Sequence, residues 1–157
     1  MSVFLINTVL FFIAGAGCLA VGSIILNNPP IHDPPGFTQR LKTYLTTNVA
    51  ETRTNHPFSE LELRCYRMAP QTLFTRIEHA VNALGWDILD SDPTQYHLQA
   101  VVATSLLKFK DDIDIQLNLA PCGTELHIRS SSRVGRGDLG ANTRHILDLL
   151  ATLERQI

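Results

Sequence analysis

The first part of the chain is a long stretch without a charged side chain. Between Val3 and Leu26 only Asn7, Thr8 and Ser23 are clearly polar, and the other positions are apolar or small. Residues 3 through 26 make 24 residues, enough to cross about 30 Å of hydrocarbon as an α-helix. A cleaved secretory signal is the alternative, but such signals place basic residues before a shorter apolar run, and no Lys or Arg precedes this one. The pattern favours an uncleaved transmembrane anchor over residues 1–26. Small residues before Cys18 also resemble a lipoprotein cleavage site, which leaves lipidation as an alternative.

Residues 27–57 have a different character from the anchor. Asn27 to Gly36 is rich in proline, which predicts an extended, stiff spacer that holds the following domain off the bilayer. Residues 37–58 have few periodic apolar positions, and we expect a short helix around Thr38 to Leu45 there. We therefore interpret 27–57 as a linker and lead-in, and 58–157 as one globular domain.

The globular part opens with a strand pattern followed by a helix pattern. Glu60 to Arg67 alternates, with Leu61, Leu63 and Cys65 on one face, as in a strand with one buried side. Pro70 can begin a helix, and Gly85 can end it. Between them the apolar residues follow helical spacing: Leu73, Phe74, Ile77, Ala80, Val81 and Leu84.

Four further strands are predicted after this helix. Trp86 to Asp90 and Tyr96 to Thr104 flank a turn, and the apolar side of the second includes Tyr96, Leu98, Ala100 and Val102. Two alternating segments then surround the turn Ala120 to Gly123, which predicts a hairpin. If Leu119 faces Thr124, the register places three further pairs opposite each other: Leu117 and Leu126, Ile115 and Ile128, Asp114 and Arg129.

A last amphipathic helix completes the predicted fold. Its apolar face carries Leu139, Asn142, Ile146, Leu149, Leu150 and Leu153, and Asp138 is placed to cap its N-terminus. The element order is β-α-β-β-β-β-α. We expect an α+β fold in which both helices cover one face of a five-stranded antiparallel sheet, in a helix-grip-like arrangement after one N-terminal transmembrane helix.

Charge and cysteine content exclude several protein classes. The formal net charge is −2, whereas nucleic-acid binding needs a clustered positive field, so we expect no nucleic-acid partner. The three cysteines lack Cys-x-x-Cys spacing, which argues against a structural zinc site. Cys65 and Cys122 could form a disulfide in an oxidising compartment, but free thiols are the commoner state of such cysteines, and free thiols are what we expect.

No catalytic pattern stands out in the sequence. The six His residues are scattered without metal-ligand spacing, and neither a Gly-x-Ser-x-Gly nor a Gly-x-Gly-x-x-Gly motif occurs. Asp111 and Asp112 are neighbours on one strand and so point to opposite faces, which is poor geometry for a carboxylate dyad. We therefore expect a protein that is not an enzyme and needs no cofactor.

One stretch is chemically unusual, because arginines, hydroxyls and glycines meet where a strand runs into a helix N-terminus. Free backbone N–H groups and guanidinium groups suit an anion there. Arg136 stands at the apex between two glycines, without a strand neighbour. The candidate ligand-binding residues are Ser131, Ser132, Arg133, Arg136, Asp138, Asn142 and Arg144.

The alternative interpretation of the same stretch is a polar network that only shapes the loop. In the predicted register Asp114 already faces Arg129, and Asp112 shares a face with Ser131 and Arg133. Ordered polar networks more often stabilise a fold than bind a ligand. The residues assigned to this structural network are Asp111, Asp112, Asp114 and Arg129.

The same motif carries a resemblance to a known family. Phe109-Lys-Asp-Asp112, followed by Arg129-Ser-x-Ser-Arg-Val-Gly-x-x-Asp-Leu-Gly-x-Asn-x-Arg144, closely resembles the bacterial and plastid family called domain of unknown function 1499. Many members have a Cys-Pro-x-x-Pro-Asn-Cys segment upstream, which Arg40 to Asn55 lacks. The resemblance implies an exported or membrane-anchored envelope protein of no established activity.

Orientation and function remain hypotheses at this level. Arg40 and Lys42 follow the anchor, so the positive-inside rule mildly favours a cytoplasmic domain, whereas the family resemblance favours the periplasmic side of the inner membrane. We expect a membrane-anchored binding module that holds a lipid-like or anionic ligand. The alternative is an accessory or assembly subunit of a membrane complex, whose partner is another membrane protein.

Overall fold

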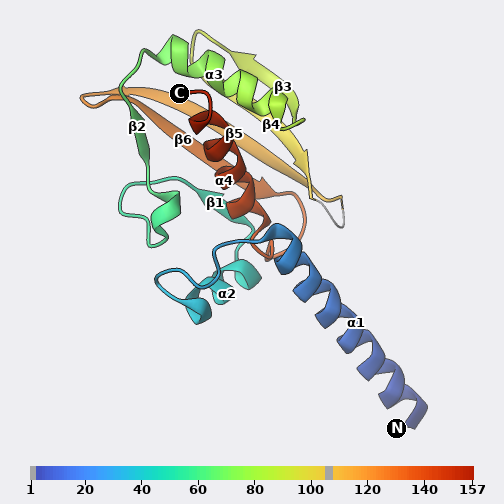
Figure 1. Cartoon of the computed structure of the whole chain (residues 1–157). Coiled ribbons are helices and arrows are strands. Elements are labelled where there is room, and N and C mark those ends of the chain that lie inside the picture. Colours follow the sequence, from blue (N-terminus) through green and yellow to red (C-terminus); the bar gives the residue numbers. More distant parts are fainter. Residues whose placement is uncertain (1–2, 105–107) are drawn as a thin grey trace.

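One antiparallel sheet organises the chain after the N-terminal helix. The structure is a computed structural model that describes residues 3–104 and 108–157, with side chains from residue 6 onward. The α+β class is confirmed, and the sheet has six strands, one more than expected. Five strands follow the order β1-β6-β5-β4-β3, and β2 also pairs with β6 (Figure 1). The strands are β1 (Val49–Glu51), β2 (Arg64–Tyr66), β3 (Asp87–Asp92), β4 (His97–Ala103), β5 (Lys110–Ala120) and β6 (Gly123–Ser132).

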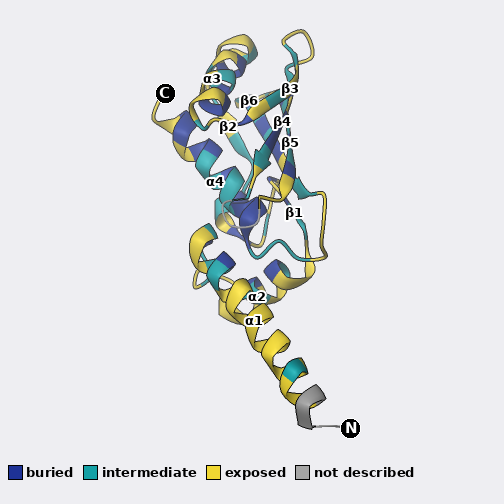
Figure 2. Cartoon of the chain, turned by 90° about the vertical axis from the view of Figure 1, so that its right-hand side faces the viewer, coloured by how far each residue is buried: buried dark blue, intermediate teal, exposed yellow. Residues whose placement is uncertain are grey.

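The N-terminal helix α1 (Val3–Asn27) stands apart from the rest of the molecule. At about 1.5 Å per residue its 25 residues extend about 37 Å, more than the ~30 Å of a bilayer's hydrocarbon. Most of its described side chains are exposed, including Phe11 at 76% and Phe12 at 70% (Figure 2). By length and composition α1 can cross a membrane, and it is not a core helix of the domain.

The lead-in contains more structure than the sequence pattern indicates. The expected short helix is present as α2 (Phe37–Thr46), and β1 follows it. The strand expected over Glu60 to Arg67 is wrong in its first half, where η1 (Ser59–Leu61) is a 3₁₀ turn. Leu61 is buried and Cys65 is exposed, so the two do not share a buried face. The first apolar residue of the alternating pattern, Leu61, is buried because the 3₁₀ turn directs it into the core. Only the later part of the pattern, β2, pairs with the sheet.

The β5–β6 hairpin has the predicted register. Leu119 pairs with Thr124, Ile115 with Ile128 and Asp114 with Arg129, and the alternation of each strand places its apolar residues on the helix side. Leu119 itself is 79% exposed, because the end of the hairpin extends beyond the helices.

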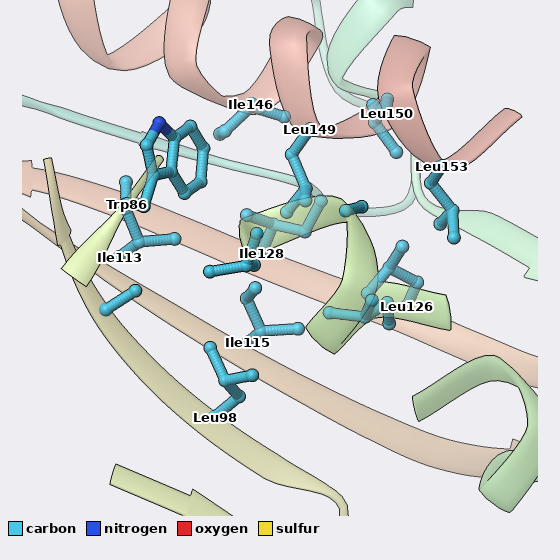
Figure 3. Packing of buried hydrophobic residues seen from close by; sticks show 14 of the residues in the cluster. Trp86, Leu98, Ile113, Ile115, Leu126, Ile128, Ile146, Leu149, Leu150 and Leu153 are labelled. Atoms are coloured by element: carbon cyan, nitrogen blue, oxygen red, sulfur yellow. The ribbon is translucent and has the colours of Figure 1, made fainter. Parts of the chain in front are cut away.

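Two helices cover one face of the sheet, as expected. α3 (Pro70–Ala83) and α4 (Ala141–Glu154) contact each other and the central strands on the same side. Figure 3 shows the strand side chains directed toward α4. The space between α4 and the sheet is filled with apolar side chains that are 0–3% exposed: Leu98, Ile113, Ile115, Leu117, Leu126, Ile128, Ile146, Leu149, Leu150 and Leu153.

The proline-rich segment packs against the domain instead of extending away from it. Pro29 is buried beside Gly140, and a turn brings the carbonyl groups of residues 33 and 34 to Arg40. Arg40 is fully buried and pairs with both carboxylate oxygens of Glu60, at 2.5 and 2.9 Å. Its guanidinium also lies 4.2 Å from the centre of the Phe58 ring. Arg40 therefore connects the segment after α1 to the core.

The expectation of two free thiols is wrong, because Cys65 and Cys122 form a disulfide. β2 pairs with the start of β6, which brings Cys65 next to the turn that carries Cys122. This pairing depends on the short strand β2 (Arg64–Tyr66), whereas the sequence pattern predicted a longer strand that began at Glu60. Cys18, on α1, is a free cysteine.

Candidate functional site

The loop between β6 and α4, residues 133–140, lies where α1, α2 and the sheet meet. A Cβ atom at Gly137 would overlap the backbone carbonyl of Leu45, so a larger residue does not fit there. Leu139 donates its backbone N–H to the Tyr44 carbonyl at 3.0 Å and accepts a hydrogen bond from the Asn27 amide at 3.1 Å. The loop therefore joins the end of α1 to the globular domain.

A cavity of about 120 Å³ opens at this junction. The last turns of α1 form one wall through Ser23 and Asn27, and the ends of β5 and β6 and the loop form the others. Two exposed apolar side chains also line it, Phe109 at 46% and Val134 at 62%. The remaining described lining residues are Thr104, Asp111, Ser132, Gly135, Gly137, Asp138, Leu139 and Ala141.

Asp111 is the most unusual residue of this cavity. Its side chain is completely buried, and its Oδ2 atom lies 3.0 Å from Nε2 of His145 on α4. Its Oδ1 atom is buried without a hydrogen-bond partner among the described residues. A buried carboxylate oxygen without a partner costs free energy, and such a group in a native fold calls for an explanation.

Asp138 is the second carboxylate of the cavity. Its two oxygens accept the backbone N–H groups of Gly140, at 2.9 Å, and Asn142, at 3.1 Å. The N-cap position of α4 is held by Gly140 and not by Asp138 as predicted, but the Asp138 side chain still satisfies N–H groups at the helix start. Burial raises the pKa of Asp138 above its ordinary value, and the negative charge of Asp111 acts in the same direction, although these N–H groups oppose both. Two carboxyl groups thus share one poorly solvated space.

A buried network of amide and hydroxyl groups holds the ends of the strands against α4. The Asn142 amide donates to the Asn48 carbonyl and to the Ser132 hydroxyl, both at 2.9 Å, and its oxygen accepts from the Ser130 hydroxyl at 2.5 Å. Asn142 is fully buried and has all its hydrogen bonds within the protein. Its role in the structure is to position the loop and Ser132.

The structure does not gather the candidate arginines into one site. Arg133 pairs with Asp112 through Nε and Nη2, with a shortest distance of 2.6 Å, and Arg144 pairs with Asp148 at 2.5 Å. The hydrogen bond with Arg133 lowers the pKa of Asp112. Arg136 is exposed, and no hydrogen bond or ion pair involves its side chain within the described ranges. A cluster of guanidinium groups is therefore absent from the described part of this loop.

The other residues of the predicted polar face lie where the register placed them. Asp114 is opposite Arg129 in the backbone pairing, but its carboxylate contacts His97 at 3.0 Å. Arg129 donates to the Ser131 hydroxyl at 3.0 Å. Ser131 thus stands on the outer face of the sheet, whereas Ser132 lines the cavity.

A second, larger cleft of about 460 Å³ lies between α2 and β1. Arg53 and Arg129 are on its rim and Phe58 and Leu61 are among its apolar lining. Glu51 also lines it, and no buried polar atom without a partner belongs to its described lining. It lacks the feature that distinguishes the cavity at Asp111.

The comparison with family models matches the description "Protein of unknown function (DUF1499)" over residues 28–153. The chain belongs to the DUF1499 family. The match covers most of the chain and begins right after α1, so the proline-rich segment and α2 are part of the DUF1499 region. A comparison with curated proteins finds no match.

Sequence reasoning assigned Asp111 to a structural network and set His145 aside as isolated. A usable signal was present for both residues. Asp111 was predicted to face away from Asp112, and hence toward the helices, and His145 lies three residues after Asn142 and four before Leu149 on the inward face of the last helix. The two residues are 34 positions apart in the sequence, so only the fold brings them together.

Proposed function

We propose that this DUF1499 protein is a membrane-anchored, non-catalytic binding module that holds the headgroup of a membrane lipid beside its own anchor. The observation that carries this proposal is the cavity between the last turns of α1 and the loop at residues 133–140. Asp111 lines this cavity, and its Oδ1 atom is buried without a hydrogen-bond partner among the described residues. A helix of about 37 Å extends beyond the ~30 Å hydrocarbon layer, so its last turns, and the cavity with them, would lie at the depth of lipid headgroups.

The surroundings of the cavity support a lipid ligand. Val134 and Phe109 are exposed apolar side chains that line the same cavity as Ser23 of the anchor. Apolar side chains at the edge of a membrane can contact acyl chains while polar groups bind the headgroup. The filled space between α4 and the sheet supports this location too, because a ligand there would have to displace side chains that are 0–3% exposed.

Two observations support placing the domain on the non-cytoplasmic side. The disulfide between Cys65 and Cys122 is typical of proteins in oxidising compartments such as the periplasm. Arg40, one of the two basic residues nearest the anchor, is fully buried and paired with Glu60, so structural demands account for its presence without any topological role. Of the two basic residues that favour a cytoplasmic domain under the positive-inside rule, only Lys42 then remains.

The experiment is native mass spectrometry of the full chain released from nanodiscs of mixed bacterial lipid. Two variants that place a charge on equally exposed apolar positions provide the comparison: Val134→Glu, at 62% exposure beside the cavity, and Leu89→Glu, at 60% on β3. We expect the wild type and Leu89→Glu to retain the same lipid adducts and Val134→Glu to lose them. Equal retention by all three proteins would contradict the proposal.

A second candidate function is favoured by one observation. A filled core combined with exposed apolar side chains is also what an accessory subunit of a membrane complex shows, with Val134 and Phe109 as contacts for another protein. In that case Val134→Glu would release a co-purified membrane protein in a mild detergent and leave the lipid adducts unchanged.

A further inference from the structure

We infer that the cavity beside Asp111 recognises a protonated primary amine, such as the headgroup of an aminophospholipid. This inference rests on the proposed function and specifies its ligand. It also replaces the anionic ligand expected at the Arg/Ser loop with one of the opposite charge.

The charge of the lining is the first step. Asp111 and Asp138 both line the cavity, and none of the described lining residues is Lys or Arg. The other polar side chains are hydroxyls and an amide, from Ser23, Thr104, Ser132 and Asn27. Two carboxyl groups in a poorly solvated space disfavour an anion and favour a cation.

The lining contains an oxygen atom that needs a hydrogen-bond donor. The Asp111 Oδ1 atom is buried in a residue of 0% exposure and has no donor among the described residues. Both Asp138 oxygens already accept backbone N–H groups but keep lone pairs for a further donor. A primary ammonium carries three donors, so one group can satisfy the Asp111 oxygen and contact its neighbours at the same time.

Metal ions and quaternary ammonium groups fit the cavity less well than a primary ammonium. Three or more His, Cys, Asp or Glu side chains in metal-binding arrangement do not occur among the described residues. A quaternary ammonium such as choline has the charge but no N–H group, so it would leave the Asp111 oxygen without a partner. The volume of about 120 Å³ is several times the ~10–15 Å³ that one water needs on this measure, and is enough for a short aminoalkyl group.

Arg136 does not line the cavity itself, and we assign it to the phosphate of such a headgroup outside the cavity. It lies between Gly135 and Gly137, which both line the cavity, and its guanidinium has no partner in the described structure. A zwitterionic headgroup would therefore place its amine near Asp111 and its phosphate near the loop.

The test uses the full chain in nanodiscs that contain equal parts of phosphatidylethanolamine, phosphatidylcholine and phosphatidylglycerol. Native mass spectrometry then identifies the lipids that remain bound. We expect phosphatidylethanolamine to exceed phosphatidylcholine by about tenfold or more, because one charge-assisted hydrogen bond contributes about that factor to affinity. Added ethanolamine distinguishes the two sources of an amine, since it should displace the lipid only if the free amine binds alone.

Two variants test the site from opposite sides of the cavity. Asp111→Asn removes the charge and keeps the side-chain shape, and we expect the preference for phosphatidylethanolamine to disappear. Ser23→Leu fills the cavity from α1 and leaves the sequence of the globular domain unchanged, so it should abolish the preference as well. It provides the test if Asp111→Asn does not fold. Val21→Leu, at a lipid-facing position with 58% exposure, is the matched control and should retain the preference.

The outcomes separate this inference from the proposed function. Retention of the three lipids in equal amounts, or an unchanged preference in both Asp111→Asn and Ser23→Leu, would overturn the amine specificity and leave lipid binding intact. Retention of no lipid by the wild type would overturn both. A preference for phosphatidylglycerol would show that the Arg/Ser loop, and not the carboxylate cavity, selects the ligand.

Discussion

Replacement of the fully buried Arg40 should destabilise the domain more than replacement of any other single residue between residues 27 and 57. Arg40→Met removes the partner of Glu60, whose side chain is only 15% exposed. It also removes the Arg40 donors from the Pro34 carbonyl and leaves the Asp33 carbonyl with the Gly36 N–H alone. Loss of one member of a buried ion pair costs about 3–5 kcal/mol, because the remaining charge stays buried. We expect a loss of that size.

Burial alone would lower the pKa of Arg40, but its hydrogen bonds with Glu60 and Tyr44 outweigh this effect and raise the pKa above the ordinary value. The charge is therefore retained at every accessible pH. Glu60→Gln should cost less than Arg40→Met, and the double variant should cost less than the sum, because the two residues interact directly.

The assay is urea unfolding of the full chain in detergent, followed through the fluorescence of Trp86, which is the only tryptophan and is 9% exposed. A loss of 3–5 kcal/mol corresponds to a decrease of about 10–20 °C in melting temperature for a domain of this size. Lys42→Ala, an exposed residue on the same helix, should change stability by less than about 0.5 kcal/mol. If Arg40→Met also changed stability by less than about 1 kcal/mol, the buried pair would not exist as described.

Three further predictions concern the disulfide, the amide network and the cap. Reduction of Cys65–Cys122, which are 57 residues apart, should lower the unfolding free energy by about 2–4 kcal/mol, measured with and without dithiothreitol. Asn142→Ala should cost about 2–4 kcal/mol, because it leaves several buried groups without partners, and Asn142→Asp should not restore the loss. Because burial raises the pKa of Asp138, the folded state binds the proton more tightly than the unfolded state, so this contribution to stability is complete below pH 3.8 and is lost as the pH rises through the raised pKa. Asp138→Asn keeps one of the two cap hydrogen bonds and removes the titrating group. It should flatten that decline in urea unfolding measured from pH 4 upward; an identical pH profile in both proteins would refute it.

The elements with a long, regular pattern were predictable from the sequence. α3 and the β5–β6 hairpin follow their expected periods because one face of each is buried over most of its length. The three-residue strand β1 was missed, because a short strand between a helix and a turn leaves too few positions for a period. Cys65 was predicted to share a buried strand face with Leu61. Leu61 lies in a 3₁₀ turn and not in the strand, so its burial does not indicate which face Cys65 occupies.

The candidate site was predictable only in part. The motif around Asp138 and Asn142 was found, since its residue types are unusual for a strand-to-helix connection. The contribution of Ser23 and Asn27 was not, because no pattern in an apolar helix tells which part of a distant loop it will contact. Partners of the charged residues were equally hard to predict, as shown by Asp114, which faces Arg129 in the register and contacts His97 instead.

The contacts of Asn27 and Pro29 also fix the rotation of α1 about its axis relative to the globular domain. Asn27 is bonded to Leu139, and Pro29 fills the space beside Gly140, so α1 enters the domain without a freely rotating joint. Each residue added to a helix turns everything beyond it by about 100°. One residue inserted between Leu19 and Ser23 would therefore rotate the outer two thirds of α1 away from its present azimuth while the sheet stayed in place. Any protein that packs on one side of α1 would meet the globular domain at one fixed angle.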